Sequence, residues 1–206
     1  MKPYFIGVAG PSCAGKSYLA KHLAEKLDAA LFHLDSYYRE LDHLSLVQRA
    51  HYNFDAPQAL DSELLLQHAG ELHKGQTIAR PVYDFATHMR TDETLELVPK
   101  PFVIVEGLFT FYWESLRKLL GTKVFVDLGE ETCLERRIER DVRERGRTRE
   151  SVLEQYHTTV APMARQYVYP ASEHADIVVT GNDNIFHEVE AVLCHVERNA
   201  GMSTRY

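Results

Sequence analysis

The fold is decided by residues 4–27, which read YFIGVAGPSCAGKSYLAKHLAEKL. Residues 4–9 form a short apolar run, which is typical of a buried strand. The segment after residue 17 is instead amphipathic, with apolar side chains at helical spacing at Leu19, Ala20, Leu23, Ala24 and Leu27. Between the two lie residues 10–17, which match the phosphate-binding pattern GxxxxGK followed by Ser or Thr, in the strand-to-helix context that the pattern requires. The stretch therefore predicts a strand, a cradle for a polyphosphate and a helix.

Length and composition limit the classes of protein that the chain can be. With 206 residues, 45% of them hydrophobic and 26% charged, it has the size and balance of one globular domain, residues 1–206. The 30 acidic residues exceed the 23 Lys and Arg, and a net charge of −7 argues against nucleic acid or an anionic membrane as a partner. Apolar runs are too short to span a bilayer and the start does not resemble a signal peptide, so we expect a cytoplasmic protein. Three distant cysteines without a CxxC pair favour reduced thiols over disulfides or a zinc site.

Further strands are predicted by four more short apolar runs, at Ala30–Leu34, Phe102–Val105, Lys123–Leu128 and Asp176–Thr180. Helical patterns separate these runs, and one of them has leucines at Leu60, Leu64, Leu65 and Leu72. Because strands and helices alternate along the chain, we expect an α/β fold. Residues 4–9 supply the fifth strand, so the fold is expected to have five parallel strands flanked by helices.

Residues 80–99 depart from this alternation. They include Pro81 and Pro99, show little helical periodicity, and place a turn-like segment, Thr91–Thr94, between two extended pieces. We therefore expect a β-hairpin inserted into the α/β frame, with its turn at residues 91–94. The polar tail, residues 199–206, is expected to fray.

The phosphate-binding pattern predicts a nucleotide site. Glycines let the backbone close around the phosphates, and amides at the start of the helix point at phosphate oxygens. The residues expected to contribute are Gly10, Ser12, Cys13, Ala14, Gly15, Lys16 and Ser17. Lys16 would neutralise phosphate charge, and Ser17 would hold Mg²⁺. Glu106, at the end of the strand that begins at Phe102, is expected to be a second group on the metal side.

Motifs of other nucleotide-binding classes are missing from the sequence. No Asp is followed three residues later by Gly, and neither an Asn-Lys-x-Asp segment nor a Leu-Ser-Gly-Gly-Gln signature occurs, so a GTPase switch or an ABC-type ATPase is disfavoured. A kinase that acts on an alcohol needs a carboxylate that orients the hydroxyl and accepts its proton. Asp35 follows the second strand, at the edge of the sheet where such folds bind ligands. Its simpler interpretation is an Asp that caps a turn.

Several separated motifs resemble those of the uridine/cytidine kinases, P-loop kinases of the phosphoribulokinase/uridine kinase superfamily. The resemblance spans residues 5–196 and rests on the phosphate loop, Asp35-Ser36-Tyr37-Tyr38, Asn53-Phe54-Asp55, Tyr83-Asp84-Phe85-Ala86-Thr87-His88-Met89-Arg90, Glu106-Gly107 and residues 136–155. It implies a P-loop kinase fold with the parallel strands in the order 2-3-1-4-5. It also implies that ATP or GTP, with Mg²⁺, phosphorylates the 5′-hydroxyl of uridine or cytidine in pyrimidine salvage. Similar kinases are often dimers or tetramers.

The resemblance also implies roles for individual residues. Asp35 would be the catalytic base beside the metal, and Asp55 would bind the ribose hydroxyls, since one carboxylate can accept hydrogen bonds from both hydroxyls of a cis-diol. Tyr83 and His88 would contact the pyrimidine. Phe85 offers further aromatic area, and a neutral histidine can pair with either uracil or cytosine. The remaining residues expected on the nucleoside side are Tyr38, Arg147 and Gln155.

Residues 136–149 form a basic island in an acidic protein, with seven arginines and three acidic residues. Arginines recur at helical spacing, and such like charges repel each other unless an anion lies between them. We therefore expect an arginine-rich lid at residues 136–150 that closes over ATP. Arg137 and Arg140 would stabilise the transferring phosphoryl group, and Gly146 would act as a hinge.

Other interpretations stay open at this point. The basic island also suits a solvated helix face, because Glu139 with Arg143 and Arg140 with Glu144 are opposite charges four residues apart. The nearest functional alternative is another small-molecule P-loop kinase, acting on nicotinamide riboside, phosphoribulose or pantothenate, and a more distant one is a nucleotide sensor without catalysis. The chain also departs from the family's glycine-rich phosphate loop at Pro11 and Cys13.

Overall fold

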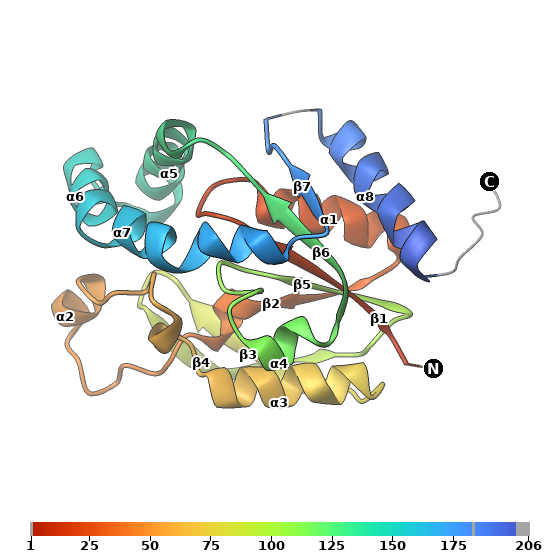
Figure 1. The fold of residues 1–206 in the computed structure, drawn as a ribbon. Helices are drawn as coiled ribbons and strands as arrows, with labels where there is room; N and C mark the ends of the chain where they lie inside the picture. The colour runs from red at the N-terminus through yellow and green to blue at the C-terminus, as the bar shows by residue number, and fades with distance from the viewer. Residues whose placement is uncertain (1, 183, 201–206) are drawn as a thin grey trace.

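The computed structural model describes residues 2–182 and 184–200 (Figure 1). Its strands are β1 (Tyr4–Ala9), β2 (Ala30–His33), β3 (Ile78–Asp84), β4 (Met89–Leu97), β5 (Phe102–Glu106), β6 (Leu120–Val126) and β7 (Ile177–Val179). Its helices are α1 (Lys16–Leu27), α2 (Leu46–Ala50), α3 (Ser62–His73), α4 (Glu114–Arg117), α5 (Glu130–Arg145), α6 (Arg149–Gln155), α7 (Ala161–Met163) and α8 (Ile185–Ala200). Short 3₁₀ and π-helical turns complete the helical segments, at Leu34–Tyr37, Pro57–Ala59, Tyr156–Val160, Ala164–Val168 and Pro170–His174.

A five-stranded parallel sheet lies at the centre, in the order β2-β5-β1-β6-β7. The element labels differ from the expected order only because the two hairpin strands take the numbers 3 and 4. Counted among the parallel strands alone, the order is 2-3-1-4-5, as the resemblance implied. β1 is central, with Ile6 opposite Ile104 of β5 and Thr122 of β6. All five strands predicted from the apolar runs are therefore confirmed.

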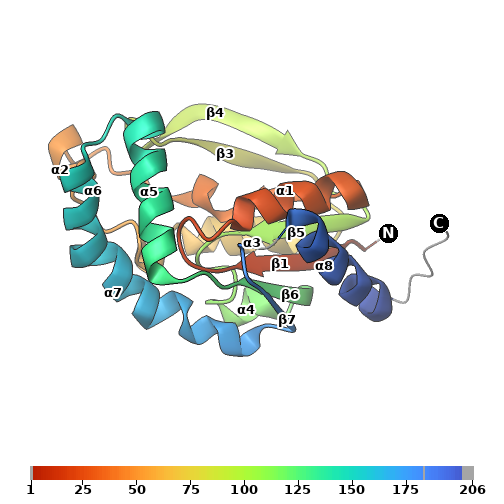
Figure 2. The same ribbon diagram turned by 90° about the horizontal axis from the view of Figure 1, so that it is seen from above.

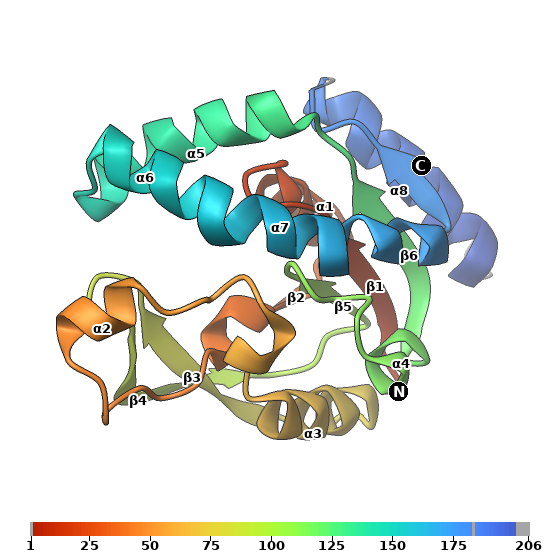
Figure 3. The same ribbon diagram turned by 60° about the vertical axis from the view of Figure 1, so that its left-hand side comes forward.

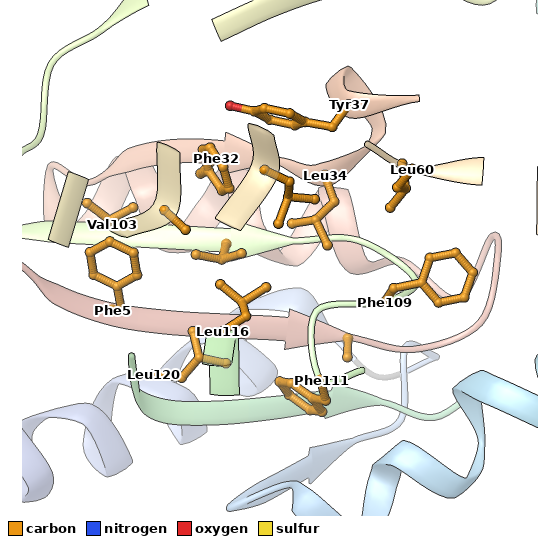
Figure 4. Packing of buried hydrophobic residues seen from close by; sticks show 14 of the residues in the cluster. Phe5, Phe32, Leu34, Tyr37, Leu60, Val103, Phe109, Phe111, Leu116 and Leu120 are labelled. Atoms are coloured by element: carbon orange, nitrogen blue, oxygen red, sulfur yellow. The ribbon is translucent and has the colours of Figure 1, made fainter. Parts of the chain in front are cut away.

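Side chains of the sheet alternate between two hydrophobic cores, one on each face. On β1, Phe5 faces the core that includes Leu65 and Leu72 of α3, whereas Ile6 faces the core that includes Leu19 of α1 and Val192 of α8. Figure 4 shows the first of these cores, and Figure 2 shows α1 and α8 together on the other face. Because both faces of the sheet are covered, the strand sequences are apolar throughout and do not alternate between apolar and polar residues.

The inserted hairpin is confirmed as β3 and β4, but its predicted turn is wrong. Thr91–Thr94 lie inside β4, with Thr94 opposite Pro81, and the chain reverses at residues 85–88 instead. Two features favour a turn there. The Asp84 carboxylate accepts hydrogen bonds from the Ala86 amide, at 2.9 Å, and the Thr87 hydroxyl, at 2.7 Å, and His88 has a left-handed φ of 55°. The threonines of β4, being β-branched, suit a strand.

Some element ends also differ from expectation. The helix predicted around Leu60 begins only at Ser62, because the Asp61 carboxylate caps it by accepting a hydrogen bond from the Leu64 amide, at 3.3 Å. At the other end of the chain, Asn199 and Ala200 continue α8 rather than fray, and residues 201–206 of the predicted tail lie outside the described residues. Within residues 2–182 and 184–200, no helix is both long and apolar enough to cross a bilayer.

Candidate active site

A cavity of about 740 Å³ opens where β1, β2 and β5 end. Figure 3 shows α5, α6 and α7 on one side of this sheet edge and α2 with the hairpin tip on the other. Sixteen of the eighteen predicted site residues line the cavity: Ser12, Cys13, Gly15, Lys16, Ser17, Asp35, Tyr38, Asp55, Tyr83, Phe85, His88, Glu106, Arg137, Arg140, Arg147 and Gln155. The other two, Gly10 and Ala14, belong to the same loop but are buried. Residues distant in sequence thus meet in one place.

The phosphate loop has the backbone shape that a cradle requires. Gly10 and Gly15 have φ values of 145° and 105°, and a Cβ on Gly10 would lie 2.3 Å from the Val126 carbonyl oxygen. Cys13 also has a left-handed φ, 65°, which is uncommon for a residue with a side chain. Pro11 contributes its carbonyl instead of an amide: it accepts a hydrogen bond from Lys16 Nζ at 2.7 Å. This bond holds the buried ammonium group inside the loop.

Glu106 is fixed from two sides at the end of β5. Its Oε2 accepts a hydrogen bond from the Ser17 hydroxyl at 3.1 Å, and its Oε1 lies 2.7 Å from His33 Nδ1. Burial opposes ionisation, but the bond and charge of His33 together with Lys16 outweigh it and lower the pKa of Glu106. His33 was missed from the sequence, because a lone histidine at the end of an apolar strand gives no signal by itself.

Ser17, Glu106 and Asp35 together offer hydroxyl and carboxylate oxygens, the donors that Mg²⁺ prefers. Across residues 2–182 and 184–200, no group of three His, Cys, Asp or Glu side chains is arranged to hold a metal on its own. This donor set fits an ion that takes part of its coordination from substrate phosphates, as Mg²⁺ commonly does.

Asp35 lies on the 3₁₀ turn that follows β2, at the wall of the cavity. Loss of hydration and the nearby charge of Glu106 raise its pKa to about 6, although Lys16 opposes the shift. A carboxylate with such a pKa is ionised at neutral pH yet is a better proton acceptor than an ordinary aspartate. The hairpin supports this turn, because Arg80 donates to the Ser36 hydroxyl at 3.2 Å and Arg90 to the Tyr37 carbonyl at 3.0 Å.

Aromatic side chains form the part of the cavity next to the hairpin. Tyr83 lies 5.1 Å from both Tyr38 and Phe85 between ring centroids, and Phe54 stacks on His88 at 5.0 Å with only 15° between the planes. The Tyr83 hydroxyl is buried and has no hydrogen-bond partner within the described part of the chain, so a polar ligand group can satisfy it. These rings form a pocket suited to a flat heterocycle.

Asp55 also lines this cavity and is buried. The Asn53 side chain shapes its turn by accepting a hydrogen bond from the Asp55 amide at 3.1 Å. Burial raises the pKa of Asp55, and the guanidinium groups of Arg137 and Arg140 partly offset the shift. The carboxylate is therefore a buried acceptor, and losing a ligand hydroxyl that pairs with it would cost binding energy.

The arginine run divides into groups with different surroundings. Arg137 is buried on α5 and donates to the Ser12 hydroxyl and to Gln155 Oε1, both at 3.0 Å, and Arg147 donates to the same Gln155 oxygen. Arg143 is exposed and pairs with Glu139 at 3.3 Å, as a solvated helix face would. The expected pair of Arg140 with Glu144 is replaced by one with Asp141, because Arg140 turns inward to that buried carboxylate at 2.8 Å.

Two further residues of this segment, which sequence reasoning missed, lie in the site or beside it. The Arg145 guanidinium lies over the Phe85 ring, 4.8 Å from its centroid, so α5 contacts the hairpin tip across the cavity. Asp141 is completely buried among the arginines. Asp141 could have been identified from the sequence, because neighbouring like charges need an anion between them. A count of charges misses it, since the count treats Asp141 only as lowering the net positive charge of the segment.

Comparisons with known proteins find a matching family, similar sequences and a similar fold. The chain matches the model of the Phosphoribulokinase / Uridine kinase family over residues 5–184. It is 40% identical over 198 residues to a uridine kinase of Chloroflexus aurantiacus, with 95% of each chain covered. It is 44% identical over 181 residues to a uridine kinase of Shewanella pealeana, covering 84% of this chain and 86% of the other. The fold resembles phosphoribulokinase from Rhodobacter spheroides, with a TM-score of 0.63 at 18% identity over 90% of this chain and 74% of that chain.

Proposed function

The chain belongs to the phosphoribulokinase/uridine kinase family, and from that membership we propose that it is a uridine kinase that phosphorylates the 5′-hydroxyl of uridine or cytidine with ATP. Relatives over nearly the whole chain length are uridine kinases. One observation supports the proposal most directly: a single cavity joins the phosphate loop, Asp35 and an aromatic pocket with a buried carboxylate, Asp55. The product would be UMP or CMP, a reaction of pyrimidine salvage suited to a cytoplasmic enzyme.

The donor half of the cavity suits the triphosphate of ATP. The amides of residues 10–17 would bind phosphate oxygens, and Lys16 would leave the Pro11 carbonyl to neutralise phosphate charge. Ser17, Glu106 and Asp35 would hold Mg²⁺, which supplies charge neutralisation on the phosphates when it is bound. The hydrogen bond between Ser17 and Glu106 supports this assignment, since it places hydroxyl and carboxylate oxygens together beside the loop.

The acceptor half suits a pyrimidine ribonucleoside. The base would lie among Tyr38, Tyr83 and Phe85 and pair with His88, whose pKa burial lowers, so its ring is neutral and offers both a donor and an acceptor. Asp55 would accept hydrogen bonds from the 2′- and 3′-hydroxyls. Arg147 and Gln155, already joined by a hydrogen bond, would contact the nucleoside from the side of α6.

Asp35 lines the same cavity as the phosphate loop and the aromatic pocket, which supports a role in the chemical step. Asp35 would orient the 5′-hydroxyl and accept its proton while the 5′-oxygen bonds to the γ-phosphorus and the bond from that phosphorus to the bridging oxygen of ADP breaks. Arg137 and Arg140 would stabilise charge on the transferring group. Within one domain of residues 1–206, the segment 136–150 would close as a lid about Gly146 and exclude water.

Replacing the proposed base tests this function. ADP release is measured for wild type, Asp35→Asn and the control Asp42→Asn, which changes an exposed carboxylate close by in sequence. We expect Asp35→Asn to lower kcat by about 10³-fold while uridine binding, measured by calorimetry, changes little. Asp42→Asn should resemble wild type. A loss of kcat smaller than about tenfold would remove Asp35 from the base role.

A panel of acceptors separates this function from its alternatives. ADP release is compared for uridine, cytidine, 2′-deoxyuridine, adenosine, nicotinamide riboside, ribulose 5-phosphate and pantothenate. The proposal expects uridine or cytidine to give the highest kcat/KM, and Asp55→Asn to lower the preference for uridine over 2′-deoxyuridine by at least about tenfold. Preference for a non-pyrimidine acceptor would favour another kinase of the family. Absence of ADP release with every acceptor would favour a sensor.

A further inference from the structure

The carboxylate of Asp141, on α5, is completely buried and lies among four guanidinium groups. Its Oδ1 accepts a two-pronged contact from Arg140, with Nη2 at 2.8 Å and Nε at 2.9 Å, and lies 3.6 Å from Arg145 Nε. Its Oδ2 lies 3.7 Å from both Arg137 Nε and Arg147 Nη1. One oxygen is thus tightly bound, whereas the other is surrounded at a longer distance.

The two long contacts are looser than hydrogen bonds. Neither Asp141 Oδ2 nor Arg137 Nε has a hydrogen-bond partner within 3.5 Å among the described residues, although both atoms are buried. The two atoms lie 3.7 Å apart, too far for a hydrogen bond. Arg137 and Arg147 therefore face Asp141 at a distance while their hydrogen bonds go to Gln155 and, for Arg137, also to Ser12. Arg140 is instead bound to Asp141 through two nitrogens.

The local sequence explains why these groups converge. Residues 137, 141 and 145 are four positions apart and therefore share one face of α5. The helix ends at Gly146, whose left-handed φ of 62° turns the chain back, and the Arg147 amide donates to the Asp141 carbonyl at 3.1 Å. Asp141 therefore gathers the arginines with its side chain and fixes the turn with its backbone.

The charges of this cluster also affect the cavity. Four guanidinium groups in one small region repel each other, and the buried carboxylate offsets part of that repulsion while leaving an excess of positive charge. All four arginines line the cavity and Asp141 does not. The excess charge is therefore presented to whatever occupies the cavity, which suits a polyanion.

We propose that Asp141 is a positioning residue that anchors Arg140 and holds Arg137 and Arg147 at its second oxygen, ready to transfer to the substrates. The inference rests on the proposed function and adds to it the group that organises the arginines before ATP and the nucleoside arrive. A purely structural ion pair needs one partner, whereas this carboxylate is shared by four side chains that line one cavity.

A double-mutant cycle on kcat distinguishes positioning from a structural role. Asp141→Asn keeps the shape and removes the charge, and we expect it to lower kcat by at least about tenfold with ATP and uridine saturating. If Asp141 acts through the arginines, its loss matters less once Arg140 is gone. The double variant with Arg140→Ala should then retain at least about fivefold more kcat than the product of the two single effects predicts. Effects that multiply to within about twofold would overturn the proposal.

The control is Glu139→Gln, two residues away on the same helix, which removes an exposed carboxylate whose partner is Arg143. We expect Glu139→Gln to keep the kcat of wild type. In a cycle with Arg140→Ala, its effect should show no coupling. If Asp141→Asn does not fold, as judged by circular dichroism, the cycle uses Asp141→Glu, which keeps the charge but moves it by one methylene. Turnover of Asp141→Glu equal to wild type would contradict the proposal, and a coupled loss would support it.

Binding of a non-hydrolysable ATP analogue, measured by calorimetry, gives a readout that does not depend on nucleoside chemistry. Asp141→Asn should weaken this binding several-fold, and Glu139→Gln should leave it unchanged. If wild type releases no ADP with any nucleoside, the proposed function fails, while the binding difference still decides the role of Asp141. Equal affinities for wild type and Asp141→Asn would overturn the positioning role.

Discussion

His33 and Glu106 stand opposite each other on neighbouring strands of the sheet and are joined by a hydrogen bond of 2.7 Å between Nδ1 and Oε1. The histidine thus fixes the carboxylate that also accepts a bond from Ser17. A group that orients a proposed metal-side carboxylate in this way affects how well the site binds the ion.

We therefore predict that His33→Phe, which keeps a ring but removes the donor, raises the Mg²⁺ concentration for half-maximal activity by about tenfold. His33→Asn, which retains a donor, should recover part of this loss. The measurement is turnover against Mg²⁺ at saturating ATP, supported by Mn²⁺ binding in the presence of ADP. His43→Phe, at an exposed histidine, is the control. An unchanged Mg²⁺ requirement in His33→Phe would show that the contact is incidental.

Arg90 connects the hairpin to the turn that carries Asp35. It donates to the Tyr37 carbonyl at 3.0 Å and pairs with Asp61 at 3.3 Å, and its side chain is only 10% exposed. Arg90→Gln should lower the free energy of unfolding by about 2 kcal/mol, since these are bonds to a charged group in a largely buried place. It should also lower kcat several-fold by loosening the turn.

Urea denaturation and steady-state kinetics measure the two effects of Arg90→Gln. Arg39→Gln is the matched control, because Arg39 is exposed and donates only to the Gln58 carbonyl among the bonds found for its side chain. Its free energy of unfolding should change by less than about 0.5 kcal/mol. If Arg90→Gln lost stability without losing turnover, the hairpin would not support the proposed base.

Two glycines should respond to alanine in opposite ways. A Cβ on Gly10 would meet the Val126 carbonyl oxygen at 2.3 Å, and its φ of 145° is unfavourable for alanine, so Gly10→Ala should destabilise the fold and abolish ATP binding. Gly70 lies inside α3, and no described part of the chain outside that helix comes within 4 Å of the place that a methyl group would take. Gly70→Ala should therefore raise the free energy of unfolding by about 0.5–1 kcal/mol. Thermal unfolding and ATP-analogue binding test both; a stable, ATP-binding Gly10→Ala would refute the strained-loop description.

Acid should weaken the fold through His68. Its Nδ1 lies 2.9 Å from the Tyr37 hydroxyl, and burial lowers its pKa from the ordinary 6.5. As pH falls below about 6.5, the unfolded chain therefore takes up this proton before the folded chain does, and the free energy of unfolding decreases. The stabilisation is fully present above that pH and is lost as pH falls through the lowered pKa of the folded state.

Urea denaturation at pH 7.5 and pH 5.5 measures this effect. Wild type should lose more free energy of unfolding between the two conditions than His68→Gln, which keeps polar groups but does not titrate. His51→Gln, at an exposed histidine, should behave like wild type. Equal losses in wild type and His68→Gln would show that other groups determine the acid sensitivity.

The sequence predicted the sheet well because buried parallel strands are apolar on both faces, as Tyr4–Ala9 and Phe102–Glu106 are. The hairpin turn was misplaced because Thr91–Thr94 contains residues found in turns, while the bonds that favour residues 85–88 come from the Asp84 side chain. A turn of this kind depends on the direction in which the aspartate side chain points, and a pattern of residue types does not show that direction.

The phosphate loop was predicted from a motif that fixes a backbone shape, whereas Asp55, Tyr83 and His88 were predicted from the family resemblance. These residues do meet in one cavity, while their roles stay predictions. His33 and Asp141 were missed for a different reason. The role proposed for each depends on its partners, Glu106 in one case and four arginines in the other. Those partners come together through strand register and helix geometry. The sequence gives no sign of the partner of His33, whereas the like charges spaced around Asp141 could have pointed to its partners.

The chain between β2 and β5 departs from one strand and returns to its hydrogen-bonded neighbour, with Ala30 opposite Val103. Everything proposed to recognise the acceptor's base and sugar from the hairpin side, including Asp55, Tyr83 and His88, is encoded inside this excursion, whereas the phosphate loop precedes it. On these proposed roles, recognition of the acceptor from the hairpin side is separated in sequence from the phosphate loop, although Asp35 lies inside the same stretch and Arg147 and Gln155 lie beyond it. A chimera that exchanges the stretch between β2 and β5 with a relative would therefore transfer the hairpin-side contacts to the acceptor while it keeps the phosphate loop of this chain.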